Sequence, residues 1–232
     1  MNNPAVAEPS SARADRTRAA ILAAAEDLFA RRGFAAARLE DVADTVKMTR
    51  AALFYYYKDK QALYDAMFED AFGPLRDELE RILAADASIS GRIEMAAGAW
   101  VDTLVARPTL ARLLMRFVAD GPEPHIHGIF SDDDQITMRF LALFEEGRSS
   151  GEITPVDDNF FLVASSVVGT TIFYVGALAT LVPPNAQPSA LETDQIVGLK
   201  AEVLRSMRHL LGIKGKTRRT ATSEKSTRRK RE

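Results

Sequence analysis

The sequence predicts an all-α protein with an N-terminal three-helix domain and a larger C-terminal helical domain. Apolar residues recur at the three-to-four-residue spacing of helices through most of the chain, and strand patterns are close to absent. The chain has 232 residues and is 47% apolar, which allows a packed core in one large or two small domains.

The charge is divided unevenly along the chain. Residues 13–63 carry a net charge of +3, residues 65–213 of −11 and residues 214–232 of +7, although the whole chain carries only −2. Such asymmetry indicates a nucleic-acid contact at one or both ends, and an acidic body disfavours DNA lying along it. We divide the chain into a disordered arm (1–12), the N-terminal domain (13–63), the C-terminal helical domain (64–213) and a basic disordered tail (214–232).

Residues 38–60 predict two short helices joined by a tight turn, as in a helix-turn-helix. Thr49 is suited to cap the second helix, and Leu53 and Tyr57 are four residues apart, so they share a buried face. The first helix has an apolar stripe of Leu39, Val42, Ala43 and Val46. The remaining faces of the second helix carry arginine and aromatic residues, which suit a DNA groove. The alternative is an ordinary helical hairpin whose aromatics belong to the core.

Three segments resemble the N-terminal domain of TetR-family transcriptional repressors: Arg31–Phe34, Leu39–Ala43 and Thr49–Leu63. In that family a glycine–aromatic turn precedes the helix-turn-helix, and the recognition helix ends in an aromatic cluster. The resemblance covers about a fifth of the chain. It implies a homodimeric, ligand-responsive DNA-binding regulator, expected to be a repressor of a palindromic operator that a small, mostly apolar effector releases.

The chain departs from the family pattern at three places. Lys47 stands where the family usually has glycine, so the turn needs either a strained left-handed backbone at this position or a modified geometry. Ala37 and Arg38 stand where a hydroxyl cap is common, and Phe54 replaces a frequent tyrosine. Each difference could change the DNA sequence that is read.

We expect Arg50 to read a base, because arginine can pair bidentately with guanine. The positively charged and tyrosine side chains around it are expected to hold phosphates. The complete predicted DNA-binding set is Arg38, Lys47, Thr49, Arg50, Ala51, Phe54, Tyr55, Tyr56 and Lys60.

The rest of the chain predicts a series of helices. Gly33 should end the first helix, and Pro74 is a possible kink in a long helix that links the two domains. The predicted helices are 15–32, 60–85, 88–106, one beginning at Pro108, 136–148, 160–182 and 191–211, with a polar loop at 120–134.

Residues 160–182 contain no charged side chain over 23 positions. A stretch of this length can span a bilayer, so a membrane-associated or scaffold protein anchored here is the alternative function. Its serines and threonines, and the absence of flanking basic clusters, favour a buried helix in a protein with no membrane contact. The resemblance implies that helices 160–182 and 191–211 form the homodimer interface.

Aromatic and methionine residues of the central helices could line an effector pocket or simply fill the core. These residues are Trp100, Met115, Phe117, Met138, Phe140, Phe144, Phe173 and Tyr174. No phosphate loop, nucleophile elbow or cysteine occurs, so we expect neither an enzyme nor a cofactor. His125 and His127, near three aspartates, are a weak metal candidate, and we expect no metal site. With no secretory signal, the expected location is the cytoplasm. An activator, or a regulator without a ligand, also fits the sequence.

Overall fold

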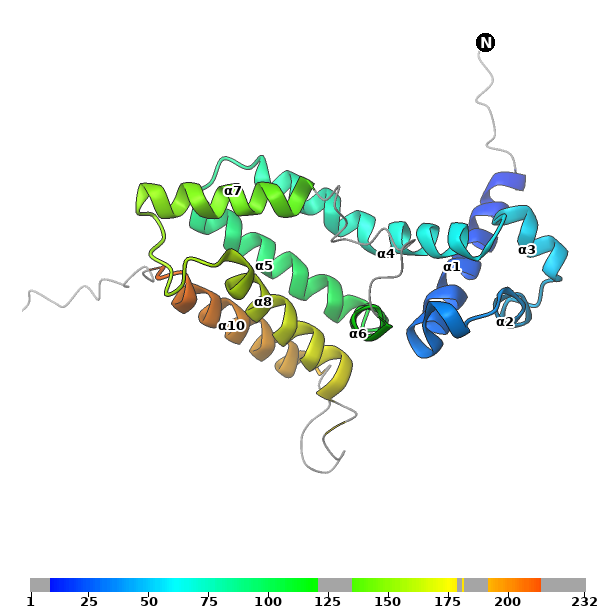
Figure 1. Ribbon diagram of the computed structural model, residues 1–232. Coiled ribbons are helices and arrows are strands. Elements are labelled where there is room, and N and C mark those ends of the chain that lie inside the picture. Colours follow the sequence, from blue (N-terminus) through cyan, green and yellow to red (C-terminus); the bar gives the residue numbers. More distant parts are fainter. Residues whose placement is uncertain (1–8, 121–134, 179–180, 182–191, 214–232) are drawn as a thin grey trace, which may run out of the picture.

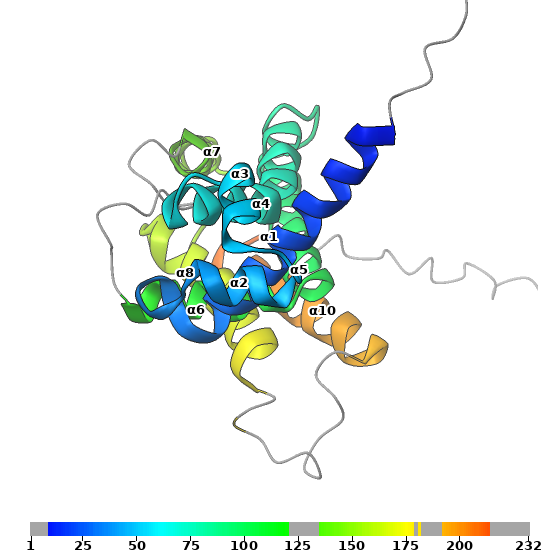
Figure 2. The same ribbon diagram turned by 90° about the vertical axis from the view of Figure 1, so that its right-hand side faces the viewer.

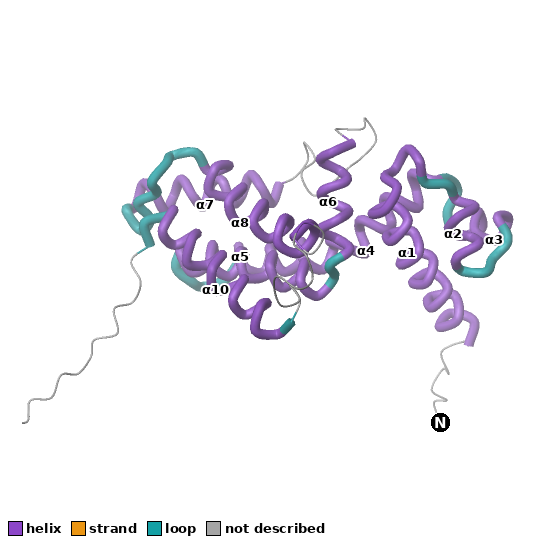
Figure 3. The backbone as a smooth tube through the Cα atoms, turned by 90° about the horizontal axis from the view of Figure 1, so that it is seen from below, coloured by secondary structure: helices purple, strands orange, loops and turns teal. Residues whose placement is uncertain are grey.

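The computed structural model describes residues 9–120, 135–178, 181 and 192–213, and every structural statement refers to these residues. They form helices joined by loops, with no strand among them (Figure 3). The prediction of an all-α fold is therefore confirmed. The predicted loop at 120–134, the end of the predicted helix at Val182 and the basic tail from residue 214 fall outside the described residues, apart from Asp120.

Three helices form the N-terminal domain at one end of the molecule (Figure 1): α1 (Pro9–Ala36), α2 (Leu39–Thr45) and α3 (Arg50–Tyr56). Helix α1 begins at Pro9, so the predicted disordered arm is four residues too long at its C-terminal end. Gly33 breaks α1 as predicted, with a φ of 75° that L-residues rarely adopt. The buried face of α1 includes Ile21, Ala25 and Phe29.

The long helix α4 (Lys60–Leu83) runs from the N-terminal domain into the body of the molecule (Figure 1). Asp59 caps it, because the Ala62 N–H donates to Asp59 Oδ1 over 2.7 Å. At 1.5 Å per residue its 24 residues span about 36 Å. One continuous helix therefore joins the end of the recognition helix to the far domain.

The C-terminal domain is built around α5 (Ile89–Ala106). This helix packs against α4, α6, α7, α8 and α10, and its buried side chains include Val101 and Leu104. The other elements are α6 (Thr109–Asp120), α7 (Gln135–Ser150), α8 (Phe160–Phe173), the π-helical turn η1 (Tyr174–Leu178) and α10 (Thr193–Leu210). Helices α8 and α10 lie side by side, below α5 in the view of Figure 1.

Helix α6 bridges the two domains. It packs on α1 along one side and on η1 along another, and Figure 2, seen from the N-terminal domain, shows it behind that domain. Leu110 and Ala111 are fully buried in this contact region. A Cβ at Gly176 would lie 3.2 Å from the Ala111 carbonyl carbon, so η1 and α6 approach too closely for a larger residue.

Candidate DNA interface and effector cavity

The turn between α2 and α3 is closed by backbone hydrogen bonds in a Schellman arrangement. The Met48 N–H donates to the Ala43 carbonyl at 2.9 Å, and the Lys47 N–H donates to the Asp44 carbonyl at 3.2 Å. Lys47 occupies the left-handed position with a φ of 56°. Of the two consequences expected from lysine at a position where the family usually has glycine, the structure shows the left-handed backbone. The conformation costs roughly 1 kcal/mol for a non-glycine residue, and it holds an exposed ammonium at the turn.

Helix α3 is anchored at both ends. The Ala52 N–H donates to Thr49 Oγ1 at 3.2 Å, so Thr49 is the N-cap that its sequence position predicts. Leu53 is fully buried and Tyr57, the C-cap residue, is buried behind it. Burial raises the pKa of the Tyr57 hydroxyl. The opposite face, which includes Ala51, Phe54 and Tyr55, is exposed.

Arg50 lies on this exposed face and is held there by two contacts. Its Nη1 is 2.7 Å from Glu40 Oε1, across the turn on α2. Its guanidinium carbon lies 5.3 Å from the centre of the Phe54 ring, within the range of a cation–π contact. The side chain is therefore presented toward solvent in a restricted position, and Glu40 must release it before it can pair with a base.

The aromatic residues at the end of α3 differ in exposure. Tyr55 is 86% exposed, whereas Tyr56 is half-buried. The two rings meet edge to face with centroids 5.5 Å apart. This contact orients a large, exposed phenol at the end of α3, where its hydroxyl can donate to a phosphate.

Lys60 makes contacts within the domain that the predicted phosphate contact did not include. Its ammonium donates to the carbonyls of Phe34, Ala35 and Ala37 at 2.7, 3.2 and 3.2 Å. It also lies 4.4 Å from the centre of the Phe34 ring. These carbonyls end α1 and enter α2, so Lys60 fastens the start of α4 to the helix-turn-helix. The prediction missed this because it requires a contact across 26 residues of sequence.

Arg38 precedes α2 in an extended conformation and makes no side-chain capping bond. The missing hydroxyl cap noted in the sequence is therefore a feature of the structure. The Arg38 side chain is exposed on the same domain as Lys47.

Arg107 joins three helices at the domain boundary. It follows α5, forms an ion pair with the buried Glu26 of α1, and lies 2.9 Å from Asp70 Oδ2 on α4. Its Nη1 also reaches the Asp70 carbonyl at 3.5 Å. That carbonyl has no helical donor, because Pro74 lacks the N–H that would bond to it. One guanidinium thus compensates for a proline in α4 and connects α4 to the DNA-facing domain.

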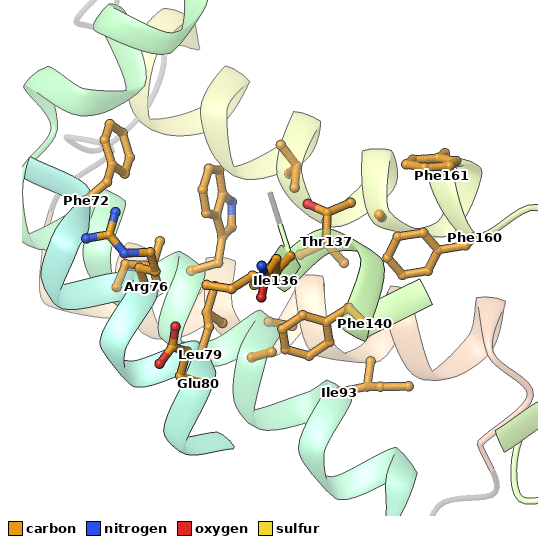
Figure 4. Close-up of a pocket in the computed structure, with 18 of the residues that line it drawn as sticks. Phe72, Arg76, Leu79, Glu80, Ile93, Ile136, Thr137, Phe140, Phe160 and Phe161 are labelled. Atoms are coloured by element: carbon orange, nitrogen blue, oxygen red, sulfur yellow. The ribbon is translucent and has the colours of Figure 1, made fainter. Parts of the chain in front are cut away.

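A cavity of about 880 Å³ lies between α4, α5, α7, α8 and α10. Figure 4 shows Phe72 and Leu79 of α4 facing Phe140 of α7 and Phe160 of α8 across it. Its aromatic lining consists of Phe68, Phe72, Trp100, Phe140, Phe144, Phe160 and Phe161. A largely apolar cavity of this volume is typical of a small-molecule site.

The cavity contains only three of the eight predicted pocket residues: Trp100, Phe140 and Phe144. The other five do not line it. Met138 and Phe173 are at least half exposed, Met115 packs beside Gly176, Phe117 lies near Phe34 at the α1–α6 contact, and the Tyr174 hydroxyl is 3.4 Å from Gln195 Oε1. Phe68, Phe72, Phe160 and Phe161 were missed.

Helix α8 buries only one side. Val163, Val167 and Thr171 face the core, whereas Phe161 and Phe173 are 57% and 50% exposed. By length and composition, Phe160–Leu178 could cross a membrane, and it is the one such helix among the residues that the structure describes. No cluster of three metal-ligating side chains occurs in the same part of the chain; His125 and His127 lie outside it.

The fold and the exposed face of α3 define a helix-turn-helix DNA-binding domain attached to a helical domain with a cavity. Residues 21–67 match the family model described as bacterial regulatory proteins, tetR family. A curated relative, the HTH-type transcriptional regulator RutR of Escherichia coli O157:H7, is 26% identical over 145 residues, which are 60% of this chain and 65% of RutR. The chain therefore spans just under two thirds of that relative.

Solved structures of similar fold cover most of the chain. A TetR family transcription regulator from Marinobacter aquaeolei VT8 has a TM-score of 0.60 at 19% identity, covering 84% of this chain and 97% of its own. The Bacillus subtilis regulator FadR, crystallised with stearoyl-CoA, has a TM-score of 0.54 at 16% identity, covering 84% and 99%. Residues 21–67 therefore match the TetR family in sequence, and the chain shares its overall fold with these solved structures.

Proposed function

We propose that the protein is a transcriptional repressor that binds a near-palindromic operator as a homodimer and leaves it when an apolar effector binds. The observation that carries the DNA-binding part is the exposed face of α3. A helix that is capped by Thr49 and anchored by Leu53 presents Arg50 and Tyr55 to solvent. A short, rigid helix of this kind fits the major groove.

In this proposal Arg50 pairs with the O6 and N7 atoms of a guanine. Lys47, Arg38, Tyr55 and Tyr56 contact the phosphates on either side, where they fix the register of the helix but carry no sequence information. Lys60 is removed from this set because its ammonium already has three carbonyl partners. Replacing Arg50 with alanine should weaken the discrimination between bases at one operator position by about 1–3 kcal/mol.

Selection from a random DNA library tests the DNA-binding role. At near-physiological salt, purified protein should recover an inverted repeat whose half-sites lie about 34–36 Å apart, or a multiple of that distance. Recovery of unrelated sequences with a steep salt dependence would mean that only general basic charge binds DNA, and the proposal would fail.

The outer faces of α8 and α10 are proposed as the homodimer interface. Leu162, Phe173 and Val197 are exposed apolar side chains, although a monomer gains nothing by exposing them. A Cβ at Gly169 or Gly198 would meet no atom within 4 Å, so another helix has room to approach closely. A second copy of the chain covers this surface by a two-fold axis, which also places two α3 helices on one DNA.

Analytical ultracentrifugation tests this interface with Leu162→Glu and Val197→Glu, which place charges on the proposed contact. Both variants should become monomeric and lose most operator affinity. Val118→Glu is the matched control, because Val118 is more exposed than either residue but lies on α6. Dimers in all three variants would rule out this face. Fractionation of the wild type also separates a DNA regulator from the membrane alternative, because only the latter requires detergent.

The cavity is proposed as the effector site. Helix α4 contributes to the cavity wall and begins shortly after α3. A ligand that changes the position of α4 therefore also changes the distance between the two α3 helices of the dimer. Such a ligand shifts the population toward a state that does not fit the operator. An effector must change both the melting temperature of the protein and its affinity for the operator. If no compound in a library of apolar small molecules changes both, the proposed effector site is contradicted.

A further inference from the structure

Charge is distributed unevenly around the effector cavity. The buried part of the lining is apolar or aromatic, while all four ionisable lining residues are exposed side chains of α4. These four residues are Asp65, Glu69, Arg76 and Glu80. They mark the opening, and they give it three negative charges and one positive charge.

Arg76, the one cation among the described lining residues, already has a partner. Arg76 donates a hydrogen bond to Glu69 and forms an ion pair with it. This contact lowers the pKa of the Glu69 carboxyl, and the charges of Asp77 and Glu80 further favour the charged form of Arg76. An anionic ligand would have to displace Glu69 and accept the remaining carboxylates as neighbours.

The buried part of the described lining has no positively charged side chain that could pair with an anion. The Trp100 indole N–H is buried and has no hydrogen-bond acceptor among the described residues, but no charged side chain of the described lining lies in the buried part. Moving a carboxylate or phosphate into such a site costs several kcal/mol unless it is paired. A cation meets the opposite situation, because carboxylates at the opening and the faces of aromatic rings both attract it.

We propose that the cavity binds an apolar or aromatic ligand whose polar end is cationic, and that it discriminates against carboxylates and phosphate esters. The apolar part lies among Phe72, Trp100, Phe140 and Phe160, and the cation lies at the opening beside Glu69 and Glu80. This inference rests on the effector role proposed above. It predicts a ligand class opposite in charge to the stearoyl-CoA named with FadR.

Three probes with the same apolar chain isolate the effect of charge: decyltrimethylammonium, decanol and decanoate. Their dissociation constants are measured calorimetrically on the full chain at pH 7.5, below the micelle concentration of each probe. We expect the ammonium to bind most tightly, decanol next and decanoate weakest, with on the order of tenfold or more between the two ions. Decanoate binding as tightly as the ammonium overturns the inference.

Charge variants test the source of this order. Glu69→Gln and Glu80→Gln should each weaken the binding of decyltrimethylammonium and reduce the ratio between its affinity and that of decanoate. Glu78→Gln is the matched control, because Glu78 lies on the same helix, pairs with Arg81 and does not line the cavity. An equal effect from all three variants would mean that general surface charge attracts the cation, which also overturns the inference.

A cavity-filling variant separates the ligand class from the effector site itself. Ala164→Phe places a ring in the cavity from the half-buried face of α8 and should weaken all three probes. If decanoate binds best and Ala164→Phe abolishes its binding, the site is correct and only the ligand class is wrong. If no probe binds, or none responds to Ala164→Phe, the effector site and the ligand class both fail, while the operator selection remains an independent test of DNA binding.

Discussion

Replacing Lys60 with methionine distinguishes a structural clamp from a phosphate contact. Methionine keeps much of the apolar stem but removes the ammonium that donates to the carbonyls of Phe34, Ala35 and Ala37. The structure assigns the ammonium to these carbonyls, so the first consequence should be a loss of stability in the N-terminal domain.

The expected size follows from the contacts. A hydrogen bond to a charged group contributes about 1.5–3 kcal/mol, and the cation–π contact with Phe34 about 0.5–1 kcal/mol. The three bonds share one ammonium, and water can replace part of them at the exposed Ala35 carbonyl, so they do not add. We expect Lys60→Met to lower the free energy of unfolding by about 2–3 kcal/mol.

Urea denaturation followed by circular dichroism measures the loss, and DNA titrations at several salt concentrations measure phosphate contacts. Each phosphate contact contributes about 0.9 to the slope of log K against log salt. Lys60→Met should leave this slope unchanged at a temperature where the variant is folded. Lys58→Met is the matched control, because Lys58 is exposed two residues away and should cost little stability.

The opposite pattern would refute this reasoning. If Lys60→Met is as stable as the wild type, and its salt slope is shallower by about 1.8 for a dimer, Lys60 holds phosphates. The carbonyl contacts would then be dispensable and the original expectation from the sequence correct.

Three further predictions concern the turn, the domain boundary and α5. Lys47→Gly should raise the free energy of unfolding by up to about 1 kcal/mol, because glycine adopts a φ of 56° without strain. It should also make the salt dependence of DNA binding shallower, because it removes a proposed phosphate contact. An unchanged free energy of unfolding in urea would contradict the backbone strain. Arg107→Met should lower the free energy of unfolding in urea by about 3 kcal/mol, because it leaves the buried Glu26 carboxylate unpaired. Adding Glu26→Gln to this variant should recover part of the loss. If it recovers none, the Arg107–Glu26 ion pair is not the cause. The Ser90 N–H and hydroxyl lower the pKa of Glu152, so its contribution is fully present above the unfolded-state pKa and is lost as pH falls through the folded-state pKa. Glu152→Gln should therefore be less stable than wild type at pH 7, and the difference should shrink as pH falls through the lowered folded-state pKa; a difference that does not depend on pH contradicts the assignment.

Local features of the DNA-binding domain were predictable from the sequence, because they depend on neighbouring residues. Thr49 caps α3 through a bond to a residue three positions away, and Lys47 takes the left-handed position that the turn requires. Leu53 and Tyr57 are buried as their spacing predicts. Each of these features is set within one or two helical turns.

Features that depend on distant contacts were not predictable in the same way. The three acceptors of Lys60 come from the end of α1, and the pairing of Arg107 with Glu26 joins residues far apart in sequence. At the N-terminus, helical structure begins at Pro9, in a segment whose composition indicated a disordered arm.

The cavity shows why aromatic content alone does not identify a pocket. Phe140 and Phe144 line it, but Met138, two residues away on the same helix, is exposed, because helical rotation decides which side chain faces inward. Phe72 was overlooked because the sequence does not reveal that the broad apolar face of α4 borders a cavity.

Methylation interference on the selected operator tests the central claim, that Arg50 on α3 reads guanine in the major groove, most directly. Dimethyl sulfate modifies guanine at N7, which faces the major groove, and adenine at N3, which faces the minor groove. The account predicts interference at guanines in two major-groove segments about one helical turn apart, or a multiple of it, and the loss of one such guanine contact per half-site in Arg50→Ala. Interference confined to adenine N3, or a pattern that Arg50→Ala leaves unchanged, would contradict it.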